Sequence, residues 1–175
     1  MAQPLRMILL DVNVLIDNYL SGRRHGEASR RLIDACRLAG IDMVYSASSV
    51  QNVFYVVTST LKRAIREEGR EVSETDARAI SRIAWECVDN LEEIGAPVGV
   101  DASDLWLARK HCILHADFED DLVIASCLRA KVDYLVTNDE ALLKKAPVAA
   151  LTSADMLSLL KMNNSSIECC EDDSR

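Results

Sequence analysis

The sequence predicts an α/β fold, a three-layer α/β/α sandwich around a central, mostly parallel five-stranded sheet. Three observations support this prediction. The chain has 175 residues, the usual size of one compact domain. Short apolar runs alternate with longer segments of helical periodicity, which is typical of βαβ units with helices on both faces of a sheet. The first apolar run, MILL at 7–10, has no polar residue on either face, as expected for a buried parallel strand.

In the first half of the chain we expect two strands and three helices. In order, these are a strand at 7–10, helices at 14–19 and 27–38, a strand at 42–46 and a helix at 50–68. Gly40 follows the second helical pattern, where a glycine commonly forms a C-cap. Ser48 or Ser49 is expected to cap the long helix that follows.

The second half is expected to alternate in the same way. It begins with a helix that Ser73 and Asp76 cap and that 95–97 breaks, followed by a strand at 98–100. Two helices come next, from Asp101 to Cys112 and from Asp117 to Leu128. The remaining elements are a strand at 134–137, a short helix that starts at 138–139, a strand at 148–151 and a helix at 153–161. We expect the domain to span 1–161. Residues 162–175 are polar and are expected to form a disordered tail.

The overall composition excludes several classes of function. The net charge is −8, whereas a protein that holds nucleic acid mainly by neutralising phosphates is normally basic. A nucleic-acid role would therefore need a local patch or a bound cation. No apolar run approaches the roughly 20 residues of a membrane span, so we expect no membrane association. The six cysteines form no CxxC motif, which favours free thiols in a reducing, cytoplasmic location.

Three acidic residues are predicted to meet at one edge of the sheet. Asp11 ends the first strand, Asp120 lies in the opening turn of a helix, and Asp139 follows the fourth strand. Ligands of such folds bind outside the carboxyl ends of the strands. An ionised carboxylate with a buried strand behind it, such as Asp11, is costly unless it is paired or bound to a metal. We therefore take these three residues as candidate catalytic and metal-binding residues.

Each of these acids also has a purely structural interpretation, which the sequence leaves open. Asp11 could cap the following helix or form an Asx-turn. Asp117 as N-cap, with Asp120 at the third helical position, is favourable capping chemistry. Asp139 could cap the short helix that follows it.

If the three acids do meet, their ligand follows from their chemistry. Clustered carboxylates raise one another's pKa and need a cation to remain ionised together. A site of oxygen ligands without Cys or His favours Mg²⁺ or Mn²⁺ over zinc. Such an ion can lower the pKa of a bound water and neutralise charge that develops on a phosphodiester. A bound metal would then supply the positive charge that an acidic protein lacks.

Two segments carry a resemblance to a known family. LLDVNVLID near the N-terminus and DFEDDLVIASCLRAKVDYLVTND near the C-terminus resemble the PIN domain, over about residues 5–155. The resemblance implies an α/β/α sandwich, dependence on Mg²⁺ or Mn²⁺, and endoribonuclease activity. Asp11, Asp120 and Asp139 match the acidic metal-site positions of the family, and Asn13 and Thr137 match polar positions beside them.

The resemblance also implies partners. Many small single-domain bacterial members are toxins of toxin–antitoxin pairs and form homodimers. We therefore expect an RNA substrate, and an antitoxin that docks near the acidic cleft and places a cation such as Arg where the metal would bind. Self-association is also expected from the wide apolar stripes predicted on the helices at 50–65 and 80–94.

The sequence departs from the family at one acidic position. The family usually has Glu or Asp in the first turns of the helix after the second strand, where this chain has Asn52. An amide brings no charge, so affinity for the ion should fall, although Asp117 or Glu119 could compensate. The favoured function is a metal-dependent endoribonuclease, and the alternative is a weakened or inactive PIN-like binding module. A phosphatase with Asp11 as nucleophile is a third reading, which Asn13 disfavours because a second Asp is usual there.

Overall fold

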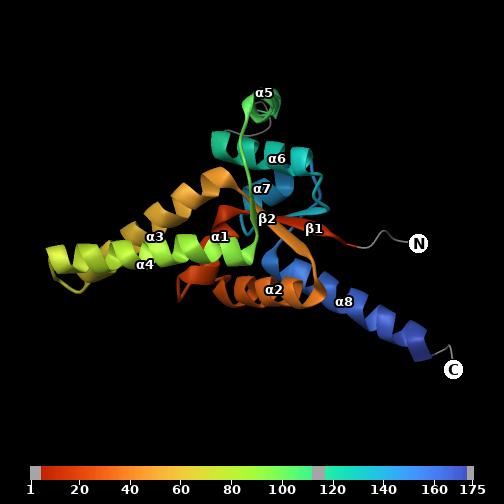
Figure 1. Cartoon of the computed structure of the whole chain (residues 1–175), viewed down its shortest axis with the longest axis horizontal. Coiled ribbons are helices and arrows are strands. Elements are labelled where there is room, and N and C mark those ends of the chain that lie inside the picture. Colours follow the sequence, from red (N-terminus) through yellow and green to blue (C-terminus); the bar gives the residue numbers. More distant parts are fainter. Residues whose placement is uncertain (1–4, 112–116, 173–175) are drawn as a thin grey trace.

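A computed structural model describes residues 5–111 and 117–172, with a five-stranded parallel sheet between two layers of helices (Figure 1). The strands are β1 (Met7–Leu10), β2 (Asp42–Ser46), β3 (Ala96–Val98), β4 (Tyr134–Val136) and β5 (Ala150–Leu151). They lie in the order β3-β2-β1-β4-β5, and every neighbouring pair is parallel. The predicted α/β/α sandwich is confirmed.

Both faces of the sheet are apolar. Successive side chains of a strand point to opposite faces, so a strand made only of apolar residues contributes to the core on each side. In β1, Ile8 and Leu10 belong to the larger core cluster, whereas Leu9 belongs to the smaller one. In β2, Tyr45 and Val44 divide between the clusters in the same way. An unbroken apolar run such as MILL is therefore the pattern that a strand covered on both faces requires.

Eight helices of the described residues cover the two faces. The larger core cluster is formed with α1 (Val12–Tyr19), α2 (Gly26–Ala39), α3 (Ala47–Glu67), α4 (Glu74–Ile94) and α8 (Ser153–Asp172). The smaller cluster is formed with α6 (Phe118–Ala130) and α7 (Glu140–Lys145), and α5 (Ala102–His111) packs on α6. Figure 1 shows α5, α6 and α7 above the strands and α2 and α8 below them. Among the described residues, no helix combines the length and apolar character needed to cross a membrane.

The strand order places a natural ligand-binding position beside β1. The chain builds outward from β1 through β2 to β3, then returns to β4 on the other side of β1. Leu10 is in register with Val136, and the N–H of Asp11 donates to the carbonyl oxygen of Val136 at 2.9 Å. Asp11 and Thr137 thus follow the ends of two neighbouring strands where the strand order reverses, and ligands of open α/β sheets bind at such points.

Most predicted helix ends are confirmed. Gly40 adopts a left-handed conformation with φ of 65° at the C-cap of α2. Ser73 and Asp76 form the predicted capping box of α4. Asp117 is the N-cap of α6.

Several boundaries differ from the prediction; among them, α1 begins at Val12 instead of residue 14, and β5 begins at Ala150 instead of residue 148. The helix α3 begins at Ala47 with Ser46 as N-cap, so neither Ser48 nor Ser49 caps it. The strand β3 begins at Ala96 instead of residue 98, because the chain enters it directly after α4. Pro97 is tolerated there because β3 is an edge strand. The helix α8 continues from Ser153 to Asp172, beyond the predicted end at 161.

Candidate functional site

Asp11 occupies the carboxyl end of β1 and is 5% exposed. One carboxylate oxygen, Oδ1, accepts the N–H of Val12 at 2.6 Å, so Asp11 is the N-cap of α1. The other, Oδ2, accepts the hydroxyl of Thr137 at 2.6 Å and the amide of Asn13. The structural interpretation of Asp11 as a cap is therefore correct. It leaves Oδ2 inside a polar cluster formed by the ends of two strands.

Burial and neighbouring acids both act on the charge of this carboxyl group. Burial raises the pKa of Asp11 from 3.8 to about 6, although the hydrogen bonds from Thr137 and Val12 oppose the rise. The charges of Asp120 and Glu119 raise this pKa further. These two side chains of α6 therefore lie close enough to Asp11 to repel its charge.

Asp11 differs from the buried carboxylates of Asp17 and Asp104 in having no cationic partner among the described residues. Asp17 pairs with Arg23, and Asp104 pairs with Arg129 at 2.9 Å. Within residues 5–111 and 117–172, no lysine or arginine pairs with Asp11. Its charge at neutral pH is compensated only by hydrogen bonds, which is the situation in which a bound cation is most favourable.

Asn13 and Thr137 hold Asp11 in place. The hydroxyl of Thr137 donates to Asp11 and accepts both the Asn13 amide at 3.0 Å and the N–H of Asp139 at 3.1 Å. The side-chain oxygen Oδ1 of Asn13 accepts the backbone N–H of Asn138 at 3.0 Å. The Thr137 hydroxyl thus makes one donated and two accepted bonds, its full capacity. The two residues that matched polar family positions do lie beside Asp11.

The start of α6 brings the remaining acids. Asp117 is exposed and accepts the N–H of Glu119 at 2.8 Å, so its carboxylate is used as a cap. Glu119 accepts a hydrogen bond from the amide of Asn52 on α3. Asp120 is half-buried and acts on Asp11 through its charge. Asn52 therefore lies beside the site as expected, but its amide hydrogen-bonds to an acidic side chain and adds no carboxylate of its own.

Asp139 is attached to the cluster through its backbone. Its N–H donates to Thr137, while its Oδ1 accepts the N–H groups of Ala141 at 2.7 Å and Leu142 at 3.1 Å and caps α7. The capping interpretation is again correct. Its Oδ2 has no hydrogen bond with any described residue, so one oxygen remains available to a ligand.

The candidate metal ligands are of the chemical type that a hard divalent cation prefers. It consists of carboxylate and amide oxygens, with the buried Asp11 carboxylate lacking a counter-ion. In the placement described, no three His, Cys, Asp or Glu side chains of the described residues lie close enough together to hold a metal. Asp11, Asp120 and Asp139 are thus brought to one edge of the sheet without forming a closed cage.

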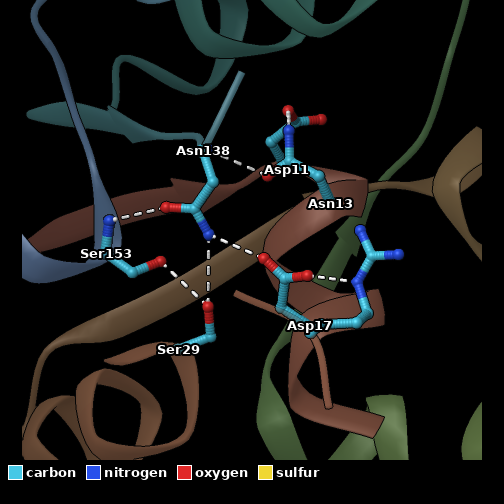
Figure 2. A network of polar contacts seen from close by, with 7 residues as sticks. Asp11, Asn13, Asp17, Ser29, Asn138 and Ser153 are labelled. Atoms are coloured by element: carbon cyan, nitrogen blue, oxygen red, sulfur yellow. Dashed lines mark hydrogen bonds and ion pairs between the residues drawn. The ribbon is translucent and has the colours of Figure 1, made fainter. Parts of the chain in front are cut away.

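Sequence reasoning missed a buried polar network beside this cluster (Figure 2). Asp17 of α1, only 2% exposed, accepts hydrogen bonds from Arg23 and from the Asn138 amide, the latter at 2.9 Å. Asn138 also contacts Ser29 of α2 at 3.3 Å and accepts the N–H of Ser153 of α8 at 3.1 Å. The network ties three helices to the end of β4. An aspartate inside the apolar pattern VLID was the only sequence signal for it.

Comparisons with known proteins identify similar chains. A family model described as the PIN domain matches residues 7–141. No match to a curated protein was found.

Three solved structures share the fold. The structure of VapBC2 from Rickettsia felis, bound to a DNA fragment from their promoter, is 12% identical over 83% of this chain and 98% of that chain, with a TM-score of 0.58. FitAB bound to an IR36 DNA fragment is 16% identical over 85% and 96%, with a TM-score of 0.58. PAE2754 from Pyrobaculum aerophilum is 16% identical over 91% and 99%, with a TM-score of 0.52.

Proposed function

The chain belongs to the PIN domain family, and we propose that it is a metal-dependent endoribonuclease that acts as the toxin of a toxin–antitoxin pair. The observation that carries the proposal is the state of Asp11. This carboxylate is buried at the reversal point of the sheet, its pKa is raised to about 6, and no cation of the described residues pairs with it. A divalent ion would stabilise the charge and bring phosphate oxygens to the same place.

The proposed roles follow the placement of each side chain. Asp11, Asp120 and Asp139 would hold Mg²⁺ or Mn²⁺. Asn13 and Thr137 orient Asp11, because each hydrogen bonds to its Oδ2. When bound, the ion supplies an activated water and positive charge for the phosphodiester oxygens.

Three further side chains complete the proposed centre. Glu119 adds a negative charge near Asp11, and Asn52 fixes Glu119 through a hydrogen bond. Asp117 orders the first turn of α6, from which Glu119 and Asp120 project.

Cleavage of RNA by the purified protein with Mg²⁺ or Mn²⁺ tests the proposal. We expect Asp11→Asn to lower the cleavage rate by a factor on the order of 100 or more, because a side chain that acts on the reacting groups contributes at least that much. Asp42→Asn is the matched control, since Asp42 is an exposed carboxylate at the opposite, amino end of β2. An Asp11→Asn variant as active as wild type would contradict the proposal.

A second candidate function, a PIN module with weak or no catalysis, is favoured by Asn52. Its amide bonds to Glu119 where the family usually places a charged ligand. Calorimetry with Mn²⁺ distinguishes the two functions. In an inactive module, the wild type shows no binding of Mn²⁺, and Asn52→Asp creates binding because it adds a second carboxylate beside Glu119. Binding of Mn²⁺ by the wild type, together with RNA cleavage, would exclude this candidate.

The proposed toxin requires an antitoxin. The fold is shared with the VapBC2 and FitAB complexes, which supports such a partner. We expect the antitoxin to dock at the acidic edge of the sheet and to place an arginine against Asp11, the buried carboxylate without a counter-ion. Co-expression with the product of the adjacent reading frame should yield a complex, and Asp11→Ala should weaken it.

We also propose a homodimer that packs through the hairpin of α3 and α4, which projects from the sheet in Figure 1. An apolar groove of about 390 Å³ lies between these helices, and its lining includes Tyr55 and Trp85, which are 60% and 56% exposed. Exposed aromatic side chains of this size favour association. We expect Trp85→Ser to shift the molecular mass in light scattering towards the monomer.

A cytoplasmic location completes the proposal. Cys36 and Cys127 are buried in the core, and burial raises the pKa of each thiol to about 12. Both behave as small apolar side chains, which is the usual use of cysteine in a reducing compartment.

A further inference from the structure

A second cavity lies directly beside the acidic cluster, and three basic side chains, Arg23, Arg24 and His25, line it. Its volume is about 340 Å³, within the range of small-ligand pockets. The residues that line it are Asn13, Asp17, Arg23, Arg24, His25, Asn138 and Asp139. Two of them, Asn13 and Asp139, also belong to the cluster around Asp11. A molecule in this cavity would therefore touch the proposed catalytic centre.

Arg23 is held in position at one end and free at the other. Its Nε donates to the buried carboxylate of Asp17, whose side chain is 3% exposed. The Arg23 side chain is 42% exposed, and its terminal nitrogens make no hydrogen bond with the described residues. A guanidinium fixed through Nε keeps its two terminal N–H₂ groups for a planar anion such as phosphate or carboxylate.

Arg24 supplies the uncompensated charge of the cavity. It is exposed and, unlike Arg23, forms no ion pair or hydrogen bond with any residue in 5–111 or 117–172. His25 is half-buried at the start of α2 and makes no capping hydrogen bond with its side chain. The cavity therefore offers several nitrogen donors without protein acceptors, which a ligand rich in acceptor oxygens would satisfy.

The two carboxylates of the lining do not cancel this preference for anions. The charge of Asp17 is used by Arg23 and by the amide of Asn138. Asp139 caps α7 through its Oδ1, and its Oδ2, which has no hydrogen bond with the described residues, is the oxygen that would bind the metal of the proposed centre. Asp139 therefore forms the border between a basic half of the cavity and the acidic centre.

We propose that this cavity binds a phosphate of the RNA backbone next to the one that is cleaved, with Arg24 as its main contact and Arg23 as a second. The inference rests on the proposed function and adds a substrate-binding subsite to it. It also explains how a chain with a net charge of −8 can approach a polyanion, because the local cations sit where the strand must pass. Single-stranded RNA is the expected ligand, since an exposed backbone can follow a short path from the cavity to Asp11.

Binding of a short, fluorescein-labelled single-stranded RNA, followed by anisotropy in Mg²⁺, tests the inference without cleavage. All proteins carry Asp11→Asn, which in the proposed mechanism slows hydrolysis by a factor on the order of 100 or more and weakens the metal-dependent part of RNA binding equally in every variant. Arg24→Gln is added to one, Arg24→Lys to a second and Arg82→Gln to a third. Arg82 is the matched control because it is an exposed arginine on α4 that forms no ion pair with a described residue and lies outside the cavity.

We expect Arg24→Gln to weaken binding roughly tenfold and to reduce the magnitude of the slope of log K against log salt by about 0.7, as for the loss of one phosphate contact on a single strand. Arg24→Lys should retain part of the affinity, because it keeps the charge but loses the paired donors. Arg82→Gln should bind like the parent. Equal binding by the Arg24→Gln variant and the Arg82→Gln variant would overturn the inference.

These outcomes are separable from the fate of the proposed function. Wild-type protein that cleaves RNA, combined with an Arg24→Gln variant that binds normally, would retain the nuclease and remove the phosphate subsite. Wild-type protein that never cleaves RNA, combined with an Arg24→Gln variant that binds weakly, would remove the nuclease and retain the subsite.

Discussion

At the residue scale, the buried carboxylate of Asp11 links the proposed chemistry to the pH dependence of folding. Its pKa is about 6 in the folded protein and 3.8 when the group is freely exposed. Below 3.8 the group is protonated in both states and burial costs little. Between pH 3.8 and about 6 the group is ionised in the unfolded protein but still protonated in the folded one, so the free energy of unfolding falls over this interval and levels off above it. The rise of the pKa from 3.8 to about 6 corresponds to about 3 kcal/mol.

Asp11→Asn is therefore expected to stabilise the metal-free protein at about pH 7.5. The amide removes the buried charge but must give up one accepted hydrogen bond, worth about 1 kcal/mol, so the gain should be about 1–2 kcal/mol. The gain should shrink to near zero at about pH 4.5, because the remaining penalty of about 1 kcal/mol is then offset by the lost hydrogen bond. Urea unfolding in EDTA at the two pH values measures this difference. A variant less stable than wild type at the higher pH would show that the buried charge is otherwise compensated.

Some residues of the site could be predicted from the sequence, and others could not. Asp11, Asn13 and Thr137 were predictable because each lies at a recognisable strand end, where the topology itself brings them together. Asp17 and Arg24 were not, since one is an acid within an apolar helix and the other an ordinary loop arginine. Only tertiary packing shows that Asp17 is neutralised by Arg23 and that Arg24 has no partner in the described part of the chain. That Asp11, Asp120 and Asp139 bind metal stays a prediction.

At the element scale, the junction between α4 and β3 depends on a glycine. A Cβ at Gly95 would lie 2.1 Å from the carbonyl oxygen of Met43, which is backbone of β2 and cannot move aside cheaply. The backbone of Gly95 is extended, so the requirement is close approach and not a left-handed conformation. The long helix α4 can therefore end directly against the sheet.

Gly95→Ala is expected to lower the free energy of unfolding by about 2–3 kcal/mol, because overpacking of a tight contact displaces the backbone. Gly99→Ala is the matched control. A Cβ at Gly99 meets nothing within 4 Å, so that variant should stay within about 0.5 kcal/mol of wild type. Equal losses in the two variants, measured by urea unfolding, would show that the contact with Met43 is not limiting.

The same junction explains why elements were predicted better than their ends. Periodicity fixes the existence of a helix or strand, and all five predicted strands are present. Boundaries depend on contacts with other elements. The start of β3 is set by the approach of Gly95 to β2, and α3 begins at Ala47 as soon as β2 ends at Ser46. The end of the domain at 161 stays a prediction.

At the scale of the whole molecule, the charge distribution limits how RNA can be held. The net charge is −8, and the proposed centre adds negative charge where the substrate must lie. Long-range attraction to a polyanion is therefore absent, in contrast to basic nucleic-acid-binding proteins. Affinity must come from a divalent ion at Asp11 and from the few cations of the cavity beside it.

This charge balance predicts that RNA binding by the wild type depends strongly on divalent ions and weakly on monovalent salt. Ca²⁺ is a hard ion with a looser coordination geometry than Mg²⁺. With Ca²⁺ in place of Mg²⁺ we expect measurable RNA binding, and EDTA should weaken this binding at least tenfold. About two phosphate contacts, from Arg23 and Arg24, give a slope of log K against log KCl of roughly −1.4 for a single strand. Anisotropy titrations at several KCl concentrations measure both quantities. Binding that survives EDTA, or a slope several times steeper, would mean that a basic surface elsewhere holds the RNA and that the acidic edge of the sheet is not where the strand lies.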